Sequence, residues 1–142
     1  MLWNIPWIVV ALILYNVLAL AFSVNPTVGA SVSVFDQELL RTTLLSQTPW
    51  ALTLGDLMIS LTLVLLFVEL MKASRHSTIS AADHGLSMLL FIVCLVEFIT
   101  VRQAATSVFF IILMVTLIDV MAGFVISIRF ARRDLSLGTE AA

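Results

Sequence analysis

Charged side chains are scarce in this sequence. Asp, Glu, Lys and Arg together make up 11% of its 142 residues, and hydrophobic residues make up 61%. Soluble domains contain about 25% charged and about 45–50% apolar residues, so this composition excludes an ordinary water-soluble domain. It also excludes a disordered chain, which needs low hydrophobicity and high net charge. The net charge is -2 and no basic stripe is present, so we expect no binding to nucleic acid. The high apolar content leaves an integral protein of the lipid bilayer as the expectation.

Motifs for chemistry are equally scarce. Cysteine occurs once, at Cys94, which excludes an intramolecular disulfide framework. The sequence has no glycine-rich phosphate loop and no zinc-protease or serine-hydrolase motif. Its two histidines, His76 and His84, are too few for a metal site, which normally needs three or four ligands. We therefore expect no cofactor, no metal and no enzymatic activity.

Long apolar runs take up most of the chain. A membrane-spanning helix needs about 20 predominantly apolar residues. Four runs approach that length, and they cover about residues 3–24, 49–71, 84–101 and 105–130. Barrel strands would be shorter and would alternate polar with apolar residues. The sequence therefore predicts an all-α polytopic membrane protein, in which residues 1–142 form one transmembrane four-helix domain.

Local signals indicate where these helices start. Thr48 offers an N-cap, and Pro49 suits the first helical position because its missing N–H costs nothing there. Ser80 to Asp83 matches a capping box for the third helix. Ala19 to Ala21 resembles a signal-peptide cleavage site, but no basic residue precedes the apolar run, so we expect this helix to be retained. Three tryptophans near the predicted ends suit the membrane interface: Trp3, Trp7 and Trp50.

The segment between the first two runs, about residues 25–48, is the longest polar stretch. Ser33 and Asp36 have the spacing of a capping box. Apolar residues then recur at helical spacing, at Phe35, Leu39, Leu40 and Leu44. This pattern predicts a short amphipathic helix from about Phe35 to Leu45, lying on the outer membrane face or over the bundle. Recognition of a partner by this helix is the alternative interpretation.

Basic residues favour one orientation. Four spans would place the N-terminus, the second loop and the C-terminus on the same side. That side carries five basic residues: Lys72, Arg75, Arg129, Arg132 and Arg133. The other side carries two, Arg41 and Arg102. Because the side richer in Lys and Arg is cytoplasmic, we expect both termini in the cytoplasm.

Four acids fall inside the apolar runs. Asp56 and Glu69 lie in the second, Glu97 in the third and Asp119 in the fourth. A charge at the bilayer centre costs about 2.5–3.5 kcal/mol on insertion scales, so these carboxyls need protons, hydrogen bonds, water or a cation. At a helical rise of about 1.5 Å per residue, Asp56 and Glu97 fall in one layer of the outer half with Asn16. Asp119 falls near the middle, and Glu69 near the cytoplasmic end, within reach of Lys72.

Two interpretations of this polar layer remain open. Its members are Asn16, Asp56, Ser60, Glu97 and Asp119. They are either a structural network that holds the helices together or a relay for protons or cations. An ionisable residue inside the membrane is a functional candidate, whereas interhelical hydrogen bonds stabilise a bundle without any further role.

Several strings resemble a known group of proteins. They are Leu54-Gly55-Asp56-Leu57, Phe67-Val68-Glu69-Leu70, Cys94-Leu95-Val96-Glu97-Phe98 and the stretch from Leu117 to Phe124. Together they resemble small, uncharacterised four-helix inner-membrane proteins of Gram-negative bacteria. The resemblance implies a multi-pass location in the bacterial inner membrane. It implies no activity and assigns no functional residues.

These observations lead to one expected function and one alternative. We expect a non-enzymatic integral membrane protein that acts as an accessory or stabilising subunit of a larger assembly, or as a small homo-oligomer. Its partners would be the lipid bilayer and other membrane-protein chains or copies of itself. The alternative is a proton- or cation-coupled transporter or channel component that uses the intramembrane carboxylates.

Overall fold

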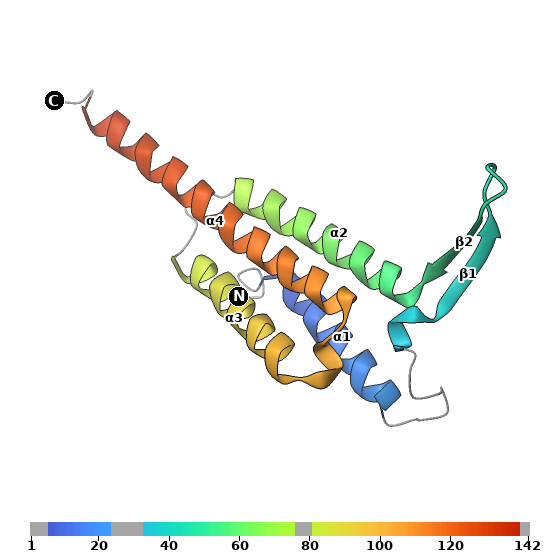
Figure 1. The fold of residues 1–142 in the computed structure, drawn as a ribbon. Helices are drawn as coiled ribbons and strands as arrows, with labels where there is room; N and C mark the ends of the chain where they lie inside the picture. Colours follow the sequence, from blue (N-terminus) through green and yellow to red (C-terminus); the bar gives the residue numbers. More distant parts are fainter. Residues whose placement is uncertain (1–5, 24–32, 76–80, 140–142) are drawn as a thin grey trace.

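The computed structural model describes residues 6–23, 33–75 and 81–139. Four helices dominate it (Figure 1): α1 (Ile8–Ser23), α2 (Leu54–Arg75), α3 (Ala81–Thr100) and α4 (Ser107–Thr139). Two single 3-10 turns, η2 (Val34–Asp36) and η3 (Arg102–Ala104), and a hairpin of β1 (Glu38–Thr43) and β2 (Pro49–Thr53) complete it. The fold is therefore mostly helical, as the sequence predicts.

Helix α4 is the central element of the bundle. It packs against both α2 and α3, while α1 packs mainly against α2. The hairpin projects from the start of α2, and the far part of α4 extends beyond its neighbours in the other direction (Figure 1). We call the end of the bundle near the hairpin the hairpin end, and the end where α2 finishes the opposite end.

The buried core runs along the inner faces of all four helices. It contains Ile8, Leu12 and Tyr15 of α1, Met58 and Leu66 of α2, Leu90 and Cys94 of α3, and Phe109, Ile112, Leu113 and Val115 of α4. The outer faces are apolar too, and Ile99 of α3 is 74% exposed. A soluble bundle would carry polar residues there, so the exposed surface suits a lipid environment.

Two of the helices in the described ranges are long and apolar enough to cross a membrane. These segments are Leu54–Ala73 of α2 and Ser107–Ile128 of α4. The apolar parts of the other two, Ile8–Phe22 and Gly85–Thr100, are shorter. The 16 residues of α1 extend about 24 Å, less than the roughly 30 Å of a hydrocarbon core. The four-span layout is therefore an inference from the sequence and not a feature of the structure.

The predicted amphipathic helix from Phe35 to Leu45 is wrong. Ser33 does cap a turn, because its hydroxyl accepts a hydrogen bond from the Phe35 N–H at 3.3 Å, but that turn ends at Asp36. Strand β1 follows and pairs antiparallel with β2. A short run of leucines fits both the period of a helix and that of a strand, and pairing with a partner strand decides between the two.

The second helix starts at Leu54, five residues later than Pro49, where the sequence predicts it. Residues 49–53 pair with β1 instead of starting the helix. A capping box then starts α2: the Asp56 N–H donates to Thr53 Oγ1 at 3.1 Å, and the Thr53 N–H donates to Asp56 Oδ2 at 2.9 Å. The reciprocal pair satisfies two N–H groups that a helix start leaves without partners.

Several predicted features lie outside the residues or side chains that the structure describes. They are the retained start of the first span with Trp3, the capping box at Ser80 and Asp83, the two histidines, and the basic side chains Arg75, Arg129, Arg132 and Arg133.

Gly55 permits a close approach at the start of α2. A Cβ atom there would lie 2.9 Å from Cγ2 of Val108 and 3.0 Å from the carbonyl oxygen of Phe35. The residue therefore allows η2, α2 and α4 to meet at the hairpin end.

We expect Gly55→Ala to lower the free energy of unfolding by about 1–3 kcal/mol, because the added methyl group overpacks this contact. Thermal or denaturant unfolding in detergent measures the change. Gly85→Ala is the matched control, since a Cβ at that helical position meets nothing within 4 Å. It should be neutral or stabilising by up to about 1 kcal/mol. Equal effects of the two substitutions would contradict the close approach.

Candidate functional site

The five residues of the predicted polar layer have different surroundings in the structure. The Asn16 side-chain amide donates to the Leu12 carbonyl of its own helix at 3.1 Å. Asp56 and Ser60 are exposed on α2. Glu97 is half-buried on α3, and Asp119 is buried within α4 at 6% exposure. Asn16 therefore bonds within its own helix, Asp56 and Ser60 are exposed, and Glu97 and Asp119 are partly or fully buried.

Asp56 contributes to the start of its own helix. Its Oδ2 atom accepts from both the N–H and the hydroxyl of Thr53, at 2.9 and 2.7 Å. A carboxylate in the first turn also interacts favourably with the positive end of the helix dipole. Because α2 starts at Leu54, Asp56 lies in the first turn of the apolar segment Leu54–Ala73 and not deeper within it. The estimate of its depth from a helix starting at Pro49 is thus corrected.

Tyr15 joins four elements at the hairpin end. Its hydroxyl donates to the Gln103 carbonyl at 2.9 Å and lies 2.6 Å from Oγ1 of Thr106. Its ring stacks on Phe35 at a centroid distance of 4.4 Å and meets the edge of Phe109 at 4.8 Å. Sequence reasoning missed this residue, although a single tyrosine in an apolar run was the available signal.

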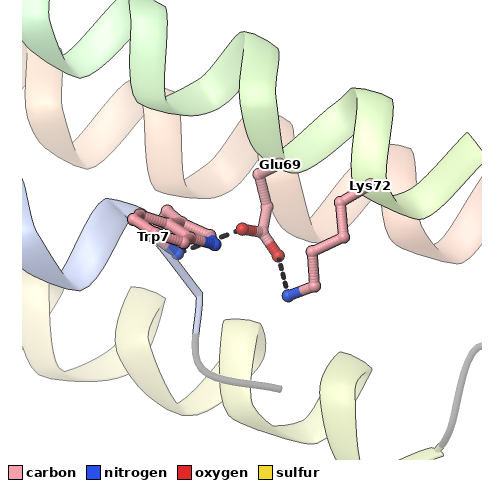
Figure 2. A network of polar contacts seen from close by, with 3 residues as sticks. All are labelled: Trp7, Glu69 and Lys72. Carbon is pink, nitrogen blue, oxygen red and sulfur yellow. Dashed lines mark hydrogen bonds and ion pairs between the residues drawn. The ribbon is translucent and has the colours of Figure 1, made fainter. Parts of the chain in front are cut away.

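Glu69 joins α1 to α2 at the opposite end (Figure 2). Its Oε1 atom lies 3.1 Å from Nζ of Lys72, and its Oε2 atom accepts from the backbone N–H of Trp7 at 3.0 Å. The contact between Glu69 and Lys72 is confirmed. The two side chains are only 12% and 15% exposed. Trp7 directly precedes α1, so the carboxylate satisfies an N–H at the helix start and lies at the favourable end of the dipole.

Small polar side chains are buried within the bundle. Thr62 of α2 and Thr116 of α4 are fully buried and donate to carbonyls of their own helices, Met58 and Leu113, at 2.7 Å each. Cys94 of α3 lies within hydrogen-bonding reach of Thr116. Small polar side chains of this kind let membrane helices approach closely.

Glu97 follows Cys94 by three residues on α3, towards the hairpin end. It is close enough to Tyr15 and Cys94 to act on both electrostatically. Its own helix packs chiefly against α4, and its neighbours Val93 and Val96 are exposed. Glu97 is thus the acid that lies between the core and the outer face of α3.

No protein-family model, no curated protein and no solved structure matches this chain. Within residues 6–23, 33–75 and 81–139, no group of three or more His, Cys, Asp or Glu side chains is placed to hold a metal ion. The function is therefore argued from the geometry of the residues described above.

Glu69→Gln should detach the start of α1. The amide keeps the size of the side chain but loses the charge that both Lys72 and the helix dipole require. We expect the free energy of unfolding to fall by about 1–3 kcal/mol, as for other buried groups that lose a partner.

The matched control is Glu38→Gln. Glu38 pairs with Arg41 at the same sequence spacing, but at 3.8 Å and with side chains that are 49% and 71% exposed. Exposed pairs contribute about 0–1 kcal/mol, so this substitution should change little. Unfolding in detergent compares the two, and equal losses would contradict the stabilising role of Glu69.

Tyr15→Phe should loosen the hairpin end without changing its packing. The ring remains, while Thr106 and the Gln103 carbonyl lose a buried hydroxyl partner. We expect a loss of about 1–2 kcal/mol. Hydrogen–deuterium exchange should quicken in η2 and η3 and stay unchanged near Glu69. Uniformly faster exchange along the chain would contradict this local role.

Proposed function

We propose that this protein is a non-enzymatic membrane subunit that acts by binding other membrane-protein chains, or copies of itself, through its outer helix faces. The observation that carries the proposal is that its acidic residues have different roles. Asp56 and Glu69 stabilise helix starts within the chain. Glu97, in contrast, borders an exposed apolar helix face.

The use of Asp56 favours a structural role over a relay. A proton relay needs carboxyl groups that exchange protons with one another or with water across the bundle. The Asp56 carboxylate accepts two hydrogen bonds from Thr53, and Asn16 is bonded within α1. Both residues are explained by helix geometry alone.

The exposure of α3 favours a protein partner. Its outer face is wide and consists of Leu86, Met88, Leu89, Ile92, Val93, Leu95, Val96 and Ile99. Lipid tails satisfy such a face but offer no hydrogen bond to the half-buried Glu97 at its border. A helix of another chain that carries a basic or hydroxyl-bearing side chain would cover the apolar face and also bond to Glu97. We therefore propose that α3 is the helix that contacts the partner.

The proposed location is the bacterial inner membrane, with all four helices spanning it and both termini in the cytoplasm. The sequence resemblance and the bias of basic residues support this placement. In the structure Arg102 lies in η3 at the hairpin end, and Lys72 lies at the opposite end beside the start of α1. The opposite end would be cytoplasmic.

A proton- or cation-coupled component is the second candidate. The burial of Asp119 within α4 favours it, because a buried carboxyl in a membrane bundle is a functional candidate. Glu97 and Asp119 would be the groups that exchange the ion.

Site-specific photo-crosslinking in native membranes tests the main proposal. A benzoylphenylalanine placed at Val96 or Ile99 should give protein adducts of discrete mass, identified by mass spectrometry. Phe67 and Val64 of α2 are exposed to a similar degree and serve as control positions. Adducts should be concentrated on α3, and Glu97→Gln should weaken them several-fold because it removes the charge offered to the partner.

The contrary outcome distinguishes the two candidates. Lipid adducts alone at all four positions would overturn the subunit proposal. Proton or cation flux in liposomes that is lost in Glu97→Gln and Asp119→Asn would then establish the second candidate. Amides retain the size and hydrogen bonding of a protonated carboxyl but cannot titrate, so folding should survive in both variants.

A further inference from the structure

The hairpin has one apolar face and one mixed face. Side chains of directly paired residues point to the same side of a sheet, and successive residues alternate. Leu40 pairs with Leu52 and Thr42 with Trp50, so these four residues share one face, which we call the leucine–tryptophan face. The opposite face carries Arg41 with Ala51 and Thr43 with Pro49.

The leucine–tryptophan face is uncovered in the structure. Leu40 is 56% exposed and Trp50 is 44% exposed. Leu44 and Leu45 extend the apolar surface to the tip, where both are exposed. A two-stranded hairpin is only marginally stable in water and needs packing against another surface. This face therefore requires a cover.

The position of the hairpin points to the membrane surface as that cover. Thr53 ends β2, and Leu54 starts the membrane-length segment of α2, so the hairpin base lies at the end of that segment. In Figure 1 the hairpin turns sharply away from the line of α2 instead of continuing it. Its six-residue strand reaches only about 20 Å, which keeps it near the boundary between lipid and water.

The chemistry of the face also fits a lipid interface. Tryptophan prefers the headgroup level of a bilayer, and leucines bury into the boundary below it. The four residues of the face carry no charge, while Arg41 lies on the opposite face and Glu38 pairs with it. At an interface, the apolar side would face lipid and the charged pair would face water.

Building on the proposed membrane function, we propose that the hairpin docks its leucine–tryptophan face onto the surface of the bilayer at the hairpin end. The docking depends on apolar burial and not on anionic lipid, because the face carries no cation. It anchors the start of α2 and keeps the hairpin from pairing with other strands.

Cysteine accessibility tests the docking. The full chain is placed in phosphatidylcholine nanodiscs at one copy per disc, with Leu40→Cys and Leu52→Cys on one face. Arg41→Cys and Ala51→Cys are the matched controls, since they are a cross-strand pair on the other face. Cys94 is fully buried and gives the background labelling. A membrane-impermeant maleimide should label the leucine positions about tenfold more slowly, because lipid shields them.

Trp50 fluorescence provides an independent readout. In a chain with Trp3→Phe and Trp7→Phe, brominated acyl chains should quench Trp50, and added salt should not reverse the quenching. Equal labelling of both faces together with unquenched Trp50 would overturn the docking. If the leucine positions are protected from labelling only when each disc holds two copies, the face is covered by a second copy of the chain and not by lipid, which would overturn the docking. A chain that does not enter the nanodiscs would overturn the membrane function itself, so the two failures are distinguishable.

Discussion

Helix ends in apolar surroundings must find hydrogen-bond partners within the chain, and this constraint organises the whole structure. Lipid offers no substitute for water, so each unsatisfied N–H or C=O group there costs several kcal/mol. At the opposite end Glu69 satisfies the N–H of Trp7. At the hairpin end Thr53 and Asp56 satisfy each other's backbone, and Tyr15 satisfies the Gln103 carbonyl. Glu69, Asp56 and Tyr15 thus act at the two ends of the bundle, while Thr62 and Thr116 bond to carbonyls of their own helices.

This arrangement leaves the outer faces free for contacts with other molecules. Tyr15, Phe35 and Phe109 stack into one aromatic cluster that holds α1, η2 and α4 together. Helix α3 packs chiefly against α4 and exposes the rest of its surface. A bundle with apolar outer faces and one projecting hairpin is suited to a role in binding. Both of our proposals place that binding on surfaces that the chain's own core does not use.

Particular residues show how far the sequence alone predicts the structure. The four helices were expected from four apolar runs, and Glu69 was expected near the cytoplasmic end, within reach of Lys72 or water. The segment at Phe35–Leu45 was misassigned, because its leucines fit a helix and a strand equally well. The same error displaced the predicted start of α2 and with it the estimated depth of Asp56. Tyr15 was missed, because its hydrogen-bond partners are 88 and 91 residues away and its only signal was its occurrence as the single tyrosine in an apolar run.

The sequence by itself determined that the protein is mostly helical. Its long apolar runs favour helices, and that signal comes from composition and local periodicity alone. Tertiary structure decided which polar residues meet. Glu69 acts on a helix start 62 residues away, and β1 exists only because β2 pairs with it. Contacts between distant segments depend on how the helices pack, and local sequence carries no record of that packing.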